Sequence, residues 1–320
     1  MKYSGFNALI TLLFTLICTA SFGADEQASK PASLRVMSFN LWHGGDAGKQ
    51  PLEQTAAVIK AAKADIVGLQ ETHGYEKKKD EPRPDHAEKL AAMLGWHYLD
   101  QGGRTGIISR YKIVANTPMK WGAKIQLEGG QSVWHFNAHF APTPYQPYQL
   151  LNIPYFDAPF IKTAEQAVNE AKKARSKQVS TMLEEVKAHA TDGAAIFITG
   201  DFNEPSHLDW TTAVAKAGKC PLPVEWPTTK AVMDAGFLDA IRVIHPDPLT
   251  RPAHTWTPIT DITDAKDRHD RIDFVFARGK DIRITAAQIV GESKASADII
   301  VSPYPSDHRA VVVEVRMSKD

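Results

Sequence analysis

The most constraining feature of this sequence is a series of short apolar segments that each end in an acid, an amide or an imidazole. Leu34–Phe39 and Ala195–Thr199 are typical of β-strands, the first by its alternation and the second by its continuous apolar run. The polar residues at such segment ends are Asn40, Glu71, His139, Asp201 with Asn203, Asp273, and Asp307 with His308. Any one of them is more simply explained as a turn residue or a cap. A strand end fixes the direction of a side chain, however, so the whole set indicates a site if these ends meet.

Helical segments alternate with the predicted strands. Ala164–His189 predicts a long helix that Thr163 caps, with Gln166 three residues on. Two more helices are predicted at Leu52–Lys63 and Ala87–Leu94, and further strands at Asp65–Gln70, Gly106–Ser109, Val133–His139, Arg271–Ala277, Ile282–Ile289 and Ala310–Arg316. The segments that end at Asn40 and Asn203 have a similar pattern. We therefore expect an α/β fold in which two related halves stack sheet to sheet over residues 34–318, with their strand ends at one edge.

The amino-terminal residues have the order of a secretory signal peptide. Lys2 precedes a mostly apolar run, and small residues up to Ala24 come before Asp25. We expect residues 1–24 to be removed and residues 25–33 to form a flexible lead-in, which predicts a secreted or periplasmic protein. The alternative, an uncleaved membrane anchor, is disfavoured because the run is short for a span. Cys220 would then be the only cysteine, so no intrachain disulfide could form.

The charge and the donor set limit the chemistry. The chain has 37 Lys and Arg residues against 37 Asp and Glu residues, so a neutral total weakens a nucleic-acid role without excluding one. Carboxylate and amide oxygens with no cysteine among the segment ends suit a hard cation, Mg²⁺ or Mn²⁺. Histidines that are not closely paired suit acid–base work better than zinc binding.

The motifs in their order resemble those of the endonuclease/exonuclease/phosphatase superfamily. They are Ser38-Phe39-Asn40, Leu69-Gln70-Glu71, Asn137-Ala138-His139, Gly200-Asp201-Phe202-Asn203, Arg271-Ile272-Asp273-Phe274 and Ser306-Asp307-His308. Each motif is weak, but the ordered series covers nearly the whole mature chain. The resemblance implies a four-layer α-β-β-α sandwich of two packed mixed sheets. It also implies hydrolysis of phosphate esters, the activity of a group that includes deoxyribonucleases, abasic-site endonucleases, neutral sphingomyelinases and inositol polyphosphate phosphatases.

The resemblance also implies a role for each matched residue. Glu71 would be the main metal ligand, with Asn40 and Asp307 completing or supporting the shell. Asp201 would orient the attacking water and Asn203 would hold a phosphoryl oxygen. His308 would pair with Asp273, as a base with the residue that orients it. His139 would contact the phosphate. The division of the base role between Asp201 and His308 stays open.

Other residues are weaker candidates for substrate binding. Arg104 precedes the segment Thr105–Ser109, where the resemblance suggests a phosphate-facing group, and a solvated turn arginine is the equal alternative. His43 follows Asn40 and could line the site, and Tyr145 lies in the loop after His139. Asp270 could replace Asp273 beside the histidine if the strand register differs.

The segment Ala141–Ile161 combines many prolines with aromatic residues and contains no Lys or Arg. Prolines at this density predict an irregular surface loop with an aromatic face. Such a loop could contact a lipid surface or fold over the protein as a lid.

The sequence thus predicts a metal-dependent phosphodiesterase that favours small or lipid-linked diesters. The alternatives are a nonspecific nuclease, a sphingomyelinase-like phospholipase C and a non-catalytic binding protein. No obligate protein partner is indicated.

Overall fold

The computed structural model describes residues 1–2, 32–76 and 78–318. The predicted signal peptide beyond its first two residues, and nearly all of the predicted lead-in, lie outside the described residues. In the described part of the chain, no helix is long and apolar enough to cross a membrane.

Within these ranges the strands form two mixed sheets. The seven-stranded sheet has the order β12 (Ile299–Ile300), β11 (Ile282–Gly291), β13 (Ala310–Met317), β1 (Ala32–Asn40), β2 (Ile66–Gln70), β4 (Thr105–Ser109) and β3 (His97–Gly102). The six-stranded sheet has the order β5 (Lys112–Asn116), β6 (Gly122–Gln126), β7 (Ser132–His139), β8 (Ala195–Asp201), β10 (Asp273–Arg278) and β9 (Leu238–Asp239). In each sheet, one central pair is parallel: β1 with β2 and β7 with β8.

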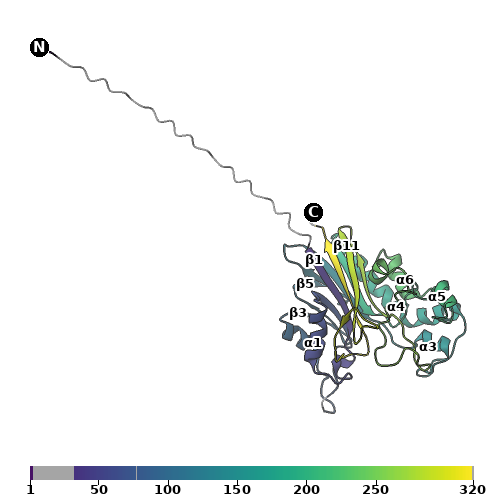
Figure 1. Cartoon of the computed structure of the whole chain (residues 1–320). Helices are drawn as coiled ribbons and strands as arrows, with labels where there is room; N and C mark the ends of the chain where they lie inside the picture. Colours follow the sequence, from purple (N-terminus) through teal and green to yellow (C-terminus); the bar gives the residue numbers. More distant parts are fainter. Residues whose placement is uncertain (3–31, 77, 319–320) are drawn as a thin grey trace. The chain divides into compact units, whose positions relative to one another are not determined.

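Helices cover the outer face of each sheet. α1 (Leu52–Ala61) and α2 (His86–Leu94) pack on the seven-stranded sheet. α4 (Ala164–His189) and α6 (Pro227–Asp234) pack on the six-stranded sheet, and Figure 1 shows them across the strands from α1. The shorter helices are η1 (His43–Gly45), α3 (Gln146–Leu151), α5 (Thr212–Lys216) and α7 (Ala240–Ile244). These layers confirm the predicted α-β-β-α sandwich.

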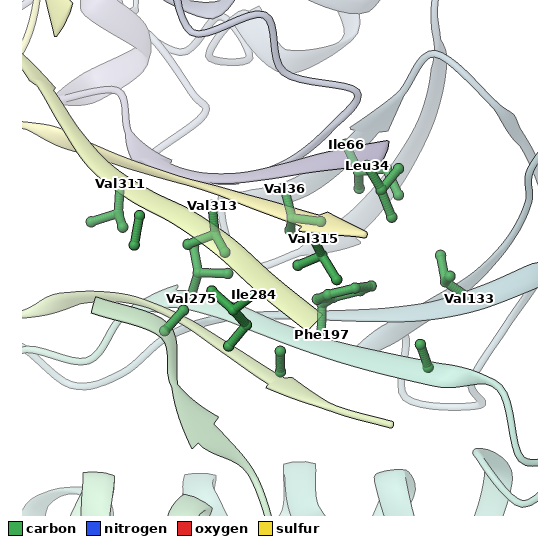
Figure 2. Close-up of a cluster of buried hydrophobic side chains, with 14 of the residues drawn as sticks. Leu34, Val36, Ile66, Val133, Phe197, Val275, Ile284, Val311, Val313 and Val315 are labelled. Carbon is green, nitrogen blue, oxygen red and sulfur yellow. The ribbon is translucent and has the colours of Figure 1, made fainter. Parts of the chain in front are cut away.

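The strands alternate their side chains between two apolar layers. On β1, Leu34 and Val36 face the core between the sheets, whereas Met37 and Phe39 face α1 and α2. Figure 2 shows this inter-sheet core, in which side chains of β1 and β13 meet those of β8 and β10. Because both faces of these strands are buried, they are rich in valine and isoleucine.

A buried polar network also lies between the sheets. Gln70 donates to the Asn137 side chain at 2.7 Å, and Thr199 donates to the same oxygen at 3.1 Å. The sheets approach so closely here that a Cβ atom on Gly68 would lie 2.0 Å from Thr199 Oγ1. Glycine at position 68 is therefore required by close approach rather than by a turn.

The long helix and its cap match the prediction. The Thr163 hydroxyl accepts from the Gln166 backbone N–H, and the Gln166 side chain accepts from the Thr163 N–H, each at 3.2 Å. The helix also holds the next segment in place through Arg175, whose guanidinium donates to the carbonyl oxygens of Ala141 and Pro144, each at 2.9 Å.

The prediction for Ala141–Ile161 was wrong in part. Gln146–Leu151 forms α3, because Pro147 occupies the first turn, where a missing N–H costs no hydrogen bond. Tyr145 and Tyr148 are buried against Ile153 and Ile272 rather than displayed on the surface. The aromatic face is carried instead by Phe156 and Phe160, which are 75% and 50% exposed.

Candidate active site

The sheet registers bring the predicted strand ends to one edge of the sandwich. Asn40 pairs with Gln70, so Glu71 follows directly beside it. In the other sheet His139 pairs with Asp201, and Asp201 pairs with Asp273. β13 runs antiparallel to β1, which places the segment before it, with Asp307 and His308, at the same edge.

Asp201 is the centre of this edge. Its Oδ2 atom accepts from Asn40 Nδ2 at 3.0 Å and lies 3.6 Å from His139 Nε2 and 3.7 Å from His308 Nε2. Its Oδ1 atom accepts from the Asn203 backbone N–H at 2.9 Å. Asp201 is only 1% exposed, so these contacts from both sheets fix its carboxylate.

His308 and Asp273 form a buried pair. His308 Nδ1 lies 2.9 Å from Asp273 Oδ2, and the Asp273 residue is fully buried. Burial alone lowers the pKa of His308, but the carboxylates of Asp273 and Asp201 raise that pKa well above its usual value. The pair therefore leaves His308 Nε2 directed toward Asp201 as a charged donor.

Asp270 does not take the place of Asp273. Its carboxylate accepts from the Tyr145 hydroxyl at 2.9 Å and from the Trp210 indole at 3.0 Å, and it pairs with Arg268 at 3.2 Å. These partners occupy Asp270 away from His308.

Glu71 and Asp307 form the open, acidic side of the site. Glu71 has a left-handed backbone with φ of 52°, and its Oε2 accepts from the His43 N–H at 3.1 Å. Burial raises its pKa, but His139, His308 and His43 together lower it below the usual value. Burial raises the pKa of Asp307 to about 6, and the nearby charges of Glu71 and Asp201 add to this rise.

Asp201, Asp273 and His308 form a group of possible metal-binding residues. Within the described ranges, these residues offer ligand atoms that lie within 4.8 Å of one another. His308 and Asp273 are already hydrogen-bonded to each other, and Asp201 lies 3.7 Å from the other ring nitrogen of His308, so this group is better described as a hydrogen-bonded pair with a third carboxylate beside it. The acids beside it are the more open positions.

Asn40 is oriented differently from the predicted metal ligand. Its Nδ2 donates to Asp201 and lies 3.4 Å from Glu71 Oε1, while its Oδ1 accepts from the Trp42 N–H at 2.9 Å. As placed, Asn40 bridges the carboxylates instead of offering oxygen to a cation.

Comparisons with known proteins identify the family and relatives of similar fold. Residues 37–308 match the family model described as Endonuclease/Exonuclease/phosphatase family. The chain belongs to this family. Its members are hydrolases that act on phosphoesters, among them nucleases and phosphatases, and they typically use a divalent metal ion.

The chain is similar to one full-length protein by sequence and to solved structures by fold. An uncharacterized protein of Caenorhabditis elegans is 27% identical over 326 residues, which cover 96% of this chain and 98% of that protein. An endonuclease/exonuclease/phosphatase structure from Beutenbergia cavernae has a TM-score of 0.52 at 20% identity, covering 89% of this chain and 72% of that one. The structure of Danio rerio TDP2 with a single-stranded DNA product also has a TM-score of 0.52, at 17% identity, covering 89% and 100%. At these identities the solved structures show the fold alone.

Three further residues predicted for the site, His43, Asn203 and Arg104, differ in how close they lie to its acids. His43 lies beside Glu71 and stacks on Tyr75 at 5.0 Å between ring centroids. Asn203 has a left-handed backbone with φ of 50°, and its Nδ2 donates to the Phe140 carbonyl at 3.1 Å. Arg104 lies in the turn between β3 and β4, where its carbonyl accepts from the Thr72 N–H at 3.0 Å, one residue beyond Glu71.

The position of Tyr145 does not fit the predicted substrate contact. The side chain is buried, and its hydroxyl is bonded to Asp270, so it lies beneath the site. Trp256, for which the sequence favours a core-packing role, contacts the ring of Tyr145 and has its ring centroid 6.4 Å from that of His308. Its signal was present in His254-Thr255-Trp256, but an isolated tryptophan is more commonly a core residue.

Proposed function

We propose that this chain is a secreted phosphodiesterase that uses Mg²⁺ or Mn²⁺ and a water nucleophile, and that it prefers small or lipid-linked diesters. The observation that carries the proposal is the juxtaposition of two acids, Glu71 and Asp307, with the hydrogen-bonded pair of His308 and Asp273 and the carboxylate of Asp201 beside that pair. A non-catalytic binding protein would have no need of a buried histidine charged by two carboxylates.

The acidic side fits a hard cation. Both groups offer oxygen, and Asp307 Oδ1 is buried without a hydrogen-bond partner. Burial, and to a smaller extent the charges of Glu71 and Asp201, raise the pKa of Asp307, so a bound cation would stabilise the ionised carboxylate. Glu71 and Asp307 would hold the cation, which neutralises charge that grows on the phosphoryl and leaving oxygens.

The protein's own groups supply orientation and proton transfer. Asp201 is fixed by Asn40 and by the Asn203 N–H, so it can accept a proton from a water held beside it. His308 can donate from Nε2 to a phosphoryl oxygen, because Asp273 keeps the ring charged and oriented. His139 presents Nε2 to the same space and can bind the phosphate.

A nuclease is the second candidate. Danio rerio TDP2, solved with a single-stranded DNA product, has the same fold. The neutral charge of this chain and the absence of basic residues in Ala141–Ile161 favour smaller substrates.

The test compares hydrolysis of bis(p-nitrophenyl) phosphate, sphingomyelin, glycerophosphodiesters, RNA and plasmid DNA with and without EDTA. Glu71→Gln keeps the shape of the side chain and removes its charge, so we expect a loss of at least about a hundredfold in kcat with an unchanged fold. Glu128→Gln, on an exposed residue, is the matched control. Full activity of Glu71→Gln, or of the EDTA-treated protein, would contradict the metal mechanism.

Export is tested separately. Amino-terminal sequencing of the protein recovered outside the cytoplasm should begin at Asp25. Recovery of the intact amino terminus in the cytoplasm would contradict the proposed secretion.

A further inference from the structure

A row of aromatic rings leads away from the catalytic histidine. From His308 the ring centroids follow at 6.4 Å to Trp256, then at 5.8 Å to Tyr148, 5.4 Å to Tyr155 and 4.8 Å to Phe156. Each step is within the range of aromatic contact, so the rings form a continuous wall. Two separate segments build it, since Trp256 lies just before the loop 257–270 and the other aromatic residues belong to Ala141–Ile161.

The wall changes from buried to exposed along its length. Tyr148 is 7% exposed and Phe156 is 75% exposed, with Tyr155 half-buried between them. Burial and the charges of Glu71, Asp201 and Asp307 raise the pKa of the Tyr155 hydroxyl. The ring contacts carry the geometry, since they connect Tyr155 to His308 through Tyr148 and Trp256.

The base of the wall is fixed to the domain. The Tyr148 hydroxyl donates to Asp267, and Thr260 donates to the same carboxylate at 2.6 Å. The two segments thus share one anchor, and Tyr155 packs directly on the anchored Tyr148. Tyr155 packs between Tyr148 and Phe156, whereas Phe156 at the end of the row is 75% exposed.

The segment that carries most of the wall, Ala141–Ile161, has no positively charged residue. Asp157 is the only charged residue in Ala141–Ile161. On the neighbouring loop, Ile259 and Ile262 are 58% and 66% exposed. A polyanion would find no cation on this segment for its phosphates, and the neighbouring loop sets Lys266 and Arg268 among four aspartates, Asp261, Asp264, Asp267 and Asp270. An apolar group would find rings and aliphatic side chains.

We propose that Tyr155 and Phe156 are specificity-determining residues that hold an apolar substituent of the phosphodiester beside the catalytic centre. This inference rests on the proposed function. It assigns the preference for such diesters to two ring faces, rather than to the acids and histidines that act on the phosphorus. It also separates these residues from Tyr145, which is buried behind the wall.

The test uses two substrates that share a leaving group. Bis(p-nitrophenyl) phosphate carries a second aromatic group, and methyl p-nitrophenyl phosphate carries a methyl group in its place. We expect Tyr155→Ala and Phe156→Ala to lower the ratio of the two kcat/KM values about three- to tenfold, the size of one aromatic contact. Tyr155→Phe should keep the ratio, because the ring and not the hydroxyl makes the contact.

Phe160→Ala is the matched control, since Phe160 is exposed on the same segment and lies outside the row of rings. An unchanged ratio in both alanine variants, or an equal change in Phe160→Ala, would overturn the inference. Single-stranded oligonucleotide forms a third arm. If Tyr155→Ala impairs its cleavage more than that of the aryl diester, the wall stacks bases and the inference is wrong.

Binding separates this inference from the proposed function. Affinities for diphenyl phosphate and dimethyl phosphate can be measured by calorimetry on the Glu71→Gln protein, which needs no turnover. If adding Tyr155→Ala to the Glu71→Gln protein weakens the binding of diphenyl phosphate but not of dimethyl phosphate, the inference is supported, even if the wild type hydrolyses no diester. If the affinity for diphenyl phosphate is the same before and after the Tyr155→Ala substitution, the inference is refuted, even if the wild type is an active phosphodiesterase.

Discussion

At the scale of single residues, we expect Asp273 to serve catalysis and Asp270 to serve stability, because the two aspartates have different partners. Asp273 orients His308, whereas Asp270 joins Tyr145, Trp210 and Arg268. We expect Asp273→Asn to lower kcat by roughly 10²–10⁴ with little change in KM, because the imidazole loses its orienting charge. Asp270→Asn should instead lower the free energy of unfolding by about 1–3 kcal/mol and retain most of kcat. Steady-state kinetics and urea unfolding of both variants check this, and the reverse pattern would show that the dyad is wrongly assigned.

A second residue-scale prediction concerns His135, which is buried between the sheets away from the site. Its Nε2 contacts Thr199 Oγ1 at 2.7 Å, and its Nδ1 has no hydrogen-bond partner. Burial lowers the pKa of His135 to about 3, so the folded protein keeps the ring neutral while the unfolded chain binds a proton below about pH 6.5. The free energy of unfolding should therefore fall as the pH falls from 6.5 toward 3, by up to about 1.4 kcal/mol per pH unit from this residue.

His135→Gln keeps a donor for Thr199 and removes the titration. Urea unfolding at several pH values should give this variant a shallower dependence on pH than the wild type, by about one proton. Parallel pH dependences in the two proteins would contradict the assignment to His135, since the carboxylates common to both would then explain the whole slope.

At the scale of elements, the strongest sequence signals were local. α4 was predicted at its observed bounds because its capping box lies within the sequence that forms it. The strands β3 and β5 were not predicted, because they lie at sheet edges and most of their residues are not buried, which leaves no apolar alternation to detect. α3 was missed because Pro147 was counted as a breaker and not as a first-turn residue.

The candidate site shows the same limit. The residues that end central strands could be listed from the sequence, because strand ends carry a local signal. Tyr155 and Trp256 could not be connected to them, since their position depends on how two distant segments pack. The orientation of Asn40 also depends on neighbours from the other sheet, above all Asp201.

A prediction at this scale concerns the contact between α4 and the segment that carries the wall. Arg175 is fully buried, donates to Gln146 at 2.7 Å and lies 3.7 Å from the buried Glu204. Arg175→Met should reduce the free energy of unfolding by about 3–5 kcal/mol, because it leaves the Glu204 charge without its partner. Adding Glu204→Gln should restore part of this loss in urea unfolding. A double variant no more stable than Arg175→Met would show that the lost contacts to Gln146 and the loop carbonyls, and not the unpaired charge, dominate.

At the scale of the whole molecule, the sandwich combines a strongly charged edge with a neutral total. Each sheet supplies part of the site, so neither half holds the full set: Glu71 and His308 come from one, and Asp201 and Asp273 from the other. Asn40 and Asp201 join the two halves through one hydrogen bond. The charge needed for phosphate chemistry is thus concentrated at one edge, while the chain as a whole has 37 positive and 37 negative side chains.

This balance leads to a prediction about salt. A protein that clamps a polymer through many phosphate contacts loses about 10³–10⁵ in affinity between ~50 and ~200 mM salt. With no net positive charge and no basic residue on the segment that carries Tyr155 and Phe156, this chain should behave differently. We expect kcat/KM for bis(p-nitrophenyl) phosphate to change by less than about twofold over that range, because a single small anion releases few counterions. Duplex DNA should be cleaved more slowly than the small diester at every salt concentration. Rapid nicking of supercoiled plasmid that salt strongly inhibits, and that exceeds turnover of the small diester, would identify the protein as a nuclease and show that a local basic groove outweighs the neutral total.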